Sequence, residues 1–199
     1  STGGAGQAVN ELTEVRDGYV NIATQDNRGL DVRMTWDRDF DFGLLTFNTQ
    51  HTFTFENATE VFEGVIEDQL GEGGEPKYVG NASLNLQRDK WAFFWRATFI
   101  GATDNTERAG GAEGTRFGET VRRVYEIPLV QYHDTSVTYD IMDDLKITAG
   151  ITNVFDKKPP RVSTAVPSSS LQQTVGDSAF YTQYDWRARR FFMNISKTF

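Results

Sequence analysis

Hydrophobic and polar residues alternate with a period of two along most of the chain. In the first clear run Leu30, Val32, Met34 and Trp36 fall on one face, and Asp31, Arg33, Thr35 and Asp37 on the other. Strict alternation of this kind predicts β-strands with two unlike faces. Seven segments have it: residues 30–36, 45–55, 82–86, 91–99, 137–141, 145–151 and 191–199. No amphipathic helix stands out, so the pattern predicts an all-β, antiparallel fold.

The predicted connections between these strands alternate in length. Residues 37–43, 87–90 and 142–144 are tight polar turns, whereas residues 57–77, 103–127 and 156–187 are long, polar and rich in Gly and Ser. Short turns at one end of a sheet and long loops at the other are typical of outer-membrane β-barrels. The five prolines all fall outside the strand interiors, as ladder hydrogen bonding requires.

The strands are also long enough to cross a bilayer. Residues 44–56 and 91–101 reach the ~9–11 residues that a tilted membrane strand needs. The polar face carries charges such as Arg33, Arg96 and Lys146, which either a wet barrel lumen or the solvent side of a soluble β-sandwich would tolerate. Seven strands would leave two bare edges, which lipid forbids, so further strands are expected upstream.

Composition narrows the classes of protein further. The chain has no Cys, which excludes disulfides and thiolate metal sites, and its net charge of −8 disfavours nucleic-acid binding. Mean hydropathy is −0.49, and no stretch approaches the ~18 apolar residues of a membrane helix. A membrane barrel keeps such a polar average because only alternate residues face lipid. No signal peptide is recognisable at Ser1.

One motif is more specific than the periodicity. Residues 150–160 read GITNVFDKKPP and resemble the G-x-x-N-hydrophobic-F-D-x-x-P-P segment in the penultimate strand of TonB-dependent receptors. Three other pieces resemble the same family: Tyr139 through the acidic turn at Asp144, residues 184–192, and Asn21 with residues 29–31. The terminal Phe199 resembles the signal that the barrel-assembly machinery reads in outer-membrane proteins. The resemblance covers residues 19–199.

The resemblance implies a fold and a function for the whole protein. Residues 1–199 would form the carboxy-terminal segment of a transmembrane β-barrel of about 22 strands around a plug, with the plug domain and the earlier strands outside this chain. Such receptors import nutrients across the Gram-negative outer membrane, driven by the TonB complex through the plug. A ferric siderophore is the first expectation, and an oligosaccharide or a passive porin-like barrel are the alternatives. The expected partners include outer-membrane lipid and lipopolysaccharide.

Candidate ligand contacts come from aromatic and cationic residues of the long loops. Arg pairs with anions and aromatic rings stack on flat chelates or sugars. The candidates are Arg116, Phe117, Arg122, Arg123, Tyr125, Phe180 and Tyr181.

Other chemistry has little support. His51 and His133 lie on different strands without a metal-ligand pattern, and Asp37-x-Asp39-x-Asp41 fits a hairpin turn better than a calcium loop. The acidic residues between Glu60 and Glu75 fit a solvated loop. No catalytic constellation is present, so neither an enzyme nor a cofactor is expected.

Overall fold

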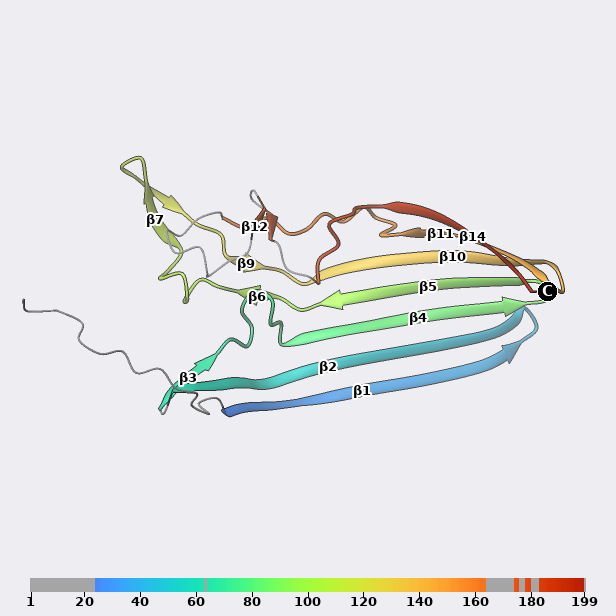
Figure 1. Ribbon diagram of the computed structural model, residues 1–199, viewed down its shortest axis with the longest axis horizontal. Helices are drawn as coiled ribbons and strands as arrows, with labels where there is room; N and C mark the ends of the chain where they lie inside the picture. The colour runs from blue at the N-terminus through green and yellow to red at the C-terminus, as the bar shows by residue number, and fades with distance from the viewer. Residues whose placement is uncertain (1–23, 63, 164–173, 176–177, 180–182, 199) are drawn as a thin grey trace, which may run out of the picture.

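Seven long antiparallel strands form one continuous sheet in the computed structural model, which describes residues 24–62, 64–163, 174–175, 178–179 and 183–198 (Figure 1). Their order across the sheet is β1-β2-β4-β5-β10-β11-β14. The strands are β1 (Thr24–Phe40), β2 (Gly43–Phe62), β4 (Tyr78–Arg88), β5 (Trp91–Ile100), β10 (Val130–Met142), β11 (Leu145–Thr152) and β14 (Arg190–Lys197). Each of the seven predicted strands is therefore confirmed, and the strands follow one another across the sheet in chain order.

Short strands lie within the connections between the long strands. They are β3 (Val65–Asp68), β6 (Thr103–Asp104), β7 (Glu113–Arg116), β8 (Glu119–Arg122), β9 (Glu126–Ile127), β12 (Thr174–Val175) and β13 (Ser178–Ala179). Of these, β3 extends the main sheet beside β2, while β6 pairs with β9, β7 with β8 and β12 with β13. None of the described residues lies in a helix long and apolar enough to cross a membrane.

The register aligns the alternating residues into rows that cross the whole sheet. One row runs from β1 to β14 through Trp36, Phe47, Leu84, Trp95, Thr135, Ile151 and Phe191. The adjacent row, on the other side, runs through Asp37, Thr46, Asn85, Phe94, Ser136, Gly150 and Phe192. Because side chains of successive residues point to opposite faces, the sheet has one apolar and one polar face.

Phe192 on the polar face needs a small cross-strand partner. A Cβ on Gly150 would lie 2.5 Å from Cζ of Phe192, so glycine at position 150 leaves room for the ring.

The apolar face has no protein layer over it in the described part of the chain. Trp91 is 54% exposed, Phe93 43%, Met193 69% and Ile195 57%, although each is large and hydrophobic. A soluble sheet would bury these side chains in a core, because a contiguous exposed apolar surface of this kind marks an interface with something else. The buried residues gather instead at one end of the sheet, among the long connections.

The connections are sorted by length, as the sequence predicts. Two-residue turns join β1 to β2, β4 to β5 and β10 to β11 at the short-turn end, whereas the connections β2–β4, β5–β10 and β11–β14 gather at the opposite, long-loop end (Figure 1).

The predicted turn at residues 37–43 is wrong in extent. Asp37 and Asp39 pair with Thr46 and Leu44 inside the β1–β2 ladder, and only Asp41 and Phe42 form the turn. These aspartates lie on the polar side of β1. They therefore indicate which face of the strand is polar, and they do not mark the end of the strand. Strand β10 likewise begins at Val130, earlier than the predicted 137, because Gln131, His133 and Thr135 obscure the alternation on its apolar face.

Candidate functional site

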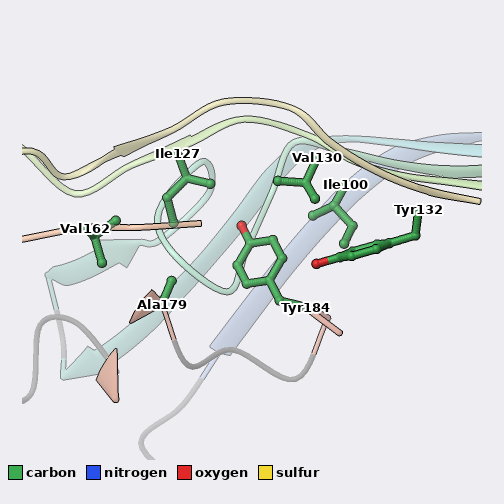
Figure 2. Close-up of a cluster of buried hydrophobic side chains, with 7 residues drawn as sticks. All are labelled: Ile100, Ile127, Val130, Tyr132, Val162, Ala179 and Tyr184. Atoms are coloured by element: carbon green, nitrogen blue, oxygen red, sulfur yellow. The ribbon is translucent and has the colours of Figure 1, made fainter. Parts of the chain in front are cut away.

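The connection between β11 and β14 folds over the polar face at the long-loop end of the sheet. Ile100, Val130 and Tyr132 point from β5 and β10 toward Val162, Ala179 and Tyr184 of the β11–β14 connection, and these residues and Ile127 form a buried cluster (Figure 2). Ile100 and Tyr132 belong to the same files as Arg96 and Asp134, so the cluster lies on the polar face. The connection after β11 therefore covers this end of the polar face.

Hydrogen bonds fasten this connection to the sheet. The backbone N–H of Asp185 donates to the Tyr132 hydroxyl at 3.1 Å, and Nη1 of Arg190 donates to both carboxylate oxygens of Asp185 at 2.9 and 3.2 Å. The backbone N–H of Arg187 also donates to Asp185 Oδ1, at 2.9 Å. Partial burial is the largest single influence on the pKa of Asp185 and raises it, but the Arg190 and Arg187 interactions together outweigh burial and lower this pKa below 3.8.

The motif after β11 is a rigid turn built by two left-handed residues. Asn153 has φ = 54° and Asp156 has φ = 52°, a conformation that Asn and Asp tolerate better than most side chains. Asn153 is 1% exposed. Its backbone N–H donates to Asp134 at 2.9 Å, its Nδ2 donates to the Lys157 carbonyl at 2.9 Å, and its Oδ1 accepts the Lys157 N–H at 2.8 Å.

The carboxylates of Asp134 and Asp156 connect this turn to the neighbouring strands. Oδ2 of Asp134 pairs with Arg96 Nη2 at 2.6 Å across the polar face, so Asp134 links β5 to the turn. Oδ1 of Asp156 accepts the backbone N–H of Arg189 at 2.9 Å, just before β14, while Oδ2 pairs with Lys158 Nζ at 2.9 Å. The hydrogen bond from Lys158, then that from Arg189, lower the pKa of Asp156. The motif thus ties the end of β11 to the start of β14.

A polar cluster interrupts the apolar face near the long-loop end. The Thr49 hydroxyl donates to the Asn81 carbonyl at 2.9 Å, so its oxygen accepts from Nε2 of His51 at 2.6 Å. Nδ1 of His51 then accepts from the Tyr78 hydroxyl at 2.8 Å in the neutral ring. The predicted position of His51 on the apolar file is confirmed, and among the described residues no group of three His, Cys, Asp or Glu could hold a metal ion.

A cleft of about 820 Å³ opens between the β2–β4 and β5–β10 connections. Its walls carry seven charged residues: Asp68, Glu72, Asp104, Glu107, Glu126, Lys77 and Arg108. The two connections are joined by the Arg108–Glu72 ion pair at 3.0 Å and by the Gly73 N–H, which donates to Asn105 Oδ1 at 2.7 Å. The cleft has the size of a small-molecule site, and its lining is acidic.

The sequence-based ligand candidates lie mostly on the β7–β8 hairpin or just after it. Arg116 ends β7, Phe117 is 94% exposed at the hairpin tip, and Arg122 is exposed at the end of β8. The Arg123 guanidinium lies against Gly114, and Tyr125 is 2% exposed. Phe180, Tyr181 and the terminal Phe199 lie outside the described residues.

The residues lining the cleft were only partly visible in the sequence. Asp68 and Glu72 belong to the acidic loop noted above, but Asp104, Glu107 and Glu126 come from a connection about 30 residues or more further along. No spacing rule brings two surface loops together, so only the fold could place these carboxylates around one space.

An open antiparallel sheet of seven long strands, with one apolar face, one polar face and loops sorted by length, has the fold of part of the β-barrel of a TonB-dependent receptor. No family model matches the sequence, and no curated protein does. The solved structures that match include two mutant forms of the ferric enterobactin receptor (PfeA) of Pseudomonas aeruginosa. Each has a TM-score of 0.54 over 87% of this chain, at 18% and 19% sequence identity. The chain spans 22% of the length of that receptor chain.

Proposed function

We propose that this chain forms part of the wall of an outer-membrane importer driven by the TonB system, with a ferric siderophore as its ligand. The observation that carries the proposal is the likeness of the fold to the barrel of a ferric enterobactin receptor. In this proposal residues 1–199 are the carboxy-terminal segment of the barrel. The plug and the segment that contacts TonB belong to the rest of the protein.

The bare apolar face supports the membrane placement. From Trp91 to Phe99 the apolar file of β5 covers eight residue steps of ~3.3 Å, or roughly 26 Å along the strand. At a tilt of ~40° this is about 20 Å along the membrane normal, close to the ~25 Å apolar band of outer-membrane barrels. Ring contacts lie at both ends of the band: Trp91 with Tyr139 at 4.3 Å and Phe99 with His51 at 6.2 Å, between ring centroids. The long-loop end then faces the cell exterior.

Ligand capture in this proposal takes place among the long loops. The contacts are Arg116, Phe117, Arg122, Arg123, Tyr125, Phe180 and Tyr181. The exposure of Phe117 and Arg122 favours direct contact, whereas the buried Tyr125 would require the loop to rearrange first. The remaining partners are lipopolysaccharide and the barrel-assembly machinery, the latter through the strand that ends at Phe199.

Uptake of a ferric catecholate siderophore loaded with radioactive iron tests this function. A strain lacking the full-length protein should take up less than a tenth of the iron of the complemented strain, and deletion of TonB should abolish uptake in both. Iron supplied as a ferrous salt is the control and should enter all strains equally. Uptake that persists without TonB would contradict the proposal and point to a passive pore. Siderophore uptake that does not depend on this protein at all would also contradict it.

A further inference from the structure

The turn between β11 and β14 carries exposed cations directly beside exposed aromatic rings. Lys157, Lys158 and Arg189 are all exposed. Phe155 is 70% exposed and Phe191 is 74% exposed. We refer to the three cations as the basic collar. The backbone positions of Lys157 and Arg189 are fixed, because Asn153 bonds to the Lys157 backbone and Asp156 accepts the backbone N–H of Arg189. The ammonium group of Lys158 pairs with Asp156 at 2.9 Å.

The two aromatic rings place the basic collar at the edge of the apolar face. Phe191 belongs to the apolar row that begins at Trp36. The Phe155 ring stands edge-on to His133, with centroids 5.0 Å apart, and His133 lies on the same file of β10 as Val137. The collar therefore lies where the bare apolar surface ends and the long loops begin.

The positive charge of this region is not a property of the whole protein. The chain carries a net charge of −8. Residues 56–77 hold seven Asp or Glu and one Lys, whereas residues 153–163 and 183–190 together hold six Lys or Arg and two Asp. Both of these Asp, Asp156 and Asp185, already have ion-pair partners within the region, Lys158 and Arg190. The cations of this region therefore outnumber its carboxylates, and the three of the basic collar are exposed.

We infer that the basic collar, with Phe155 and Phe191, binds the phosphate-bearing headgroup of a lipid in the outer leaflet. Lys and Arg donate charge-assisted hydrogen bonds to phosphate oxygens, and aromatic rings at a membrane boundary pack against the upper part of the acyl chains. A soluble anion would use the cations alone and gain nothing from the two rings. The inference rests on the membrane placement in the proposed function.

Binding of lipid A to the full-length protein in detergent tests the inference. Three probes are compared: lipid A with two phosphates, its dephosphorylated form, and inorganic phosphate. Native mass spectrometry gives the dissociation constant for each. The triple variant Lys157→Gln, Lys158→Gln, Arg189→Gln should weaken binding of phosphorylated lipid A by roughly 100-fold. The charge-preserving variant Lys157→Arg, Lys158→Arg should bind like the wild type.

A matched control removes three cations at the short-turn end: Arg38→Gln, Arg88→Gln and Lys90→Gln. It should leave the dissociation constant within about twofold of the wild-type value. Equal binding of the dephosphorylated lipid, or wild-type binding by the triple collar variant, would overturn the inference. Competition by inorganic phosphate at concentrations equal to those of the lipid would also overturn it, because the site would then recognise a free anion.

Failure of the inference and failure of the proposed function are separable. Fractionation of cells, with the heat-dependent gel mobility of a folded barrel, reports whether each variant is inserted in the outer membrane. An inserted collar variant with unchanged lipid binding refutes the lipid site alone. A wild-type protein that does not reach the outer membrane refutes the placement and the lipid site together.

Discussion

At the scale of single residues, Asn153 explains why a short motif can identify a fold. Its side chain forms two hydrogen bonds with Lys157 while its backbone occupies a left-handed conformation and its N–H bonds to Asp134. Few other residues can satisfy all of these conditions at once. The asparagine of the motif therefore has a structural role: it turns the chain at the end of β11 and directs it toward β14.

Replacing Asn153 by Ala should destabilise the folded full-length protein by about 2–3 kcal/mol. The substitution leaves the Lys157 backbone groups without partners and places a less tolerant residue at φ = 54°. Urea unfolding in detergent, followed by tryptophan fluorescence, measures the effect. Asn81→Ala, on an exposed position of β4, is the control and should cost less than about 0.5 kcal/mol. Equal effects of the two substitutions would contradict the role given to Asn153.

Asp185 gives the β11–β14 connection a dependence on pH. Its pKa is lowered in the folded state, so the folded protein binds fewer protons there than the unfolded chain. The stability that this carboxylate contributes is therefore fully present above about pH 4, and it is lost as the pH falls through the lowered folded pKa.

Comparison of wild type with Asp185→Asn should reveal this dependence. The variant should be less stable by about 1 kcal/mol at pH 5–7, because it loses the charged partner of Arg190. The difference in unfolding temperature should shrink toward zero between pH 4 and pH 2, where the wild-type carboxylate also becomes neutral. A difference that stays constant over this range would show that the charge of Asp185 is not what stabilises the connection.

At the scale of elements, adjacent residues of one strand meet different environments. Val137 faces the apolar side between Phe93 and Ala149, and Thr138 faces the polar side between Ala92 and Thr148, with its hydroxyl 2.9 Å from that of Thr148. The two positions share strand, depth and backbone pairing. They differ only in which face they occupy, so they separate the effect of the face from every other local effect.

Val137→Arg should therefore cost far more than Thr138→Arg. An arginine on a lipid-facing position near the bilayer centre costs ~2–4 kcal/mol in a membrane barrel, whereas the polar face should lose only the Thr148 contact, about 1 kcal/mol. Folding of each variant into lipid vesicles, measured by urea titration, gives both values. Similar costs on the two faces would contradict the assignment of the apolar face to lipid.

At the scale of the whole molecule, the sheet has two unpaired sides. Strands β1 and β14 are the ends of the strand order, and among the described residues they do not pair with each other. All described residues of β1 except Phe40 are exposed, as are those of β14 from Phe191 onward. Open edges and a bare apolar face make such a sheet prone to association unless further strands complete it.

The isolated chain should consequently fail to form a monomeric folded domain in water. Size-exclusion chromatography and circular dichroism should find soluble aggregates or precipitate after refolding without detergent. The full-length protein refolded in detergent should give a monodisperse species rich in β-structure. A stable, monomeric isolated chain in buffer would favour the soluble β-sandwich that the periodicity alone permits.

The sequence determined the strands, their faces and their order in the sheet, because the period-two pattern is a local property that each strand needs in order to have one apolar side. It also marked the turn at Asn153. The tertiary structure alone decided which loops meet, since loop residues follow no period. The acidic cleft, the buried cluster around Tyr184 and the junction of the Lys157 turn with Arg189 join segments far apart in the sequence: Asp68 and Glu126 of the cleft are 58 residues apart, and Ile100 and Tyr184 of the cluster are 84 residues apart. Long-range packing, which no local pattern encodes, brings these segments together.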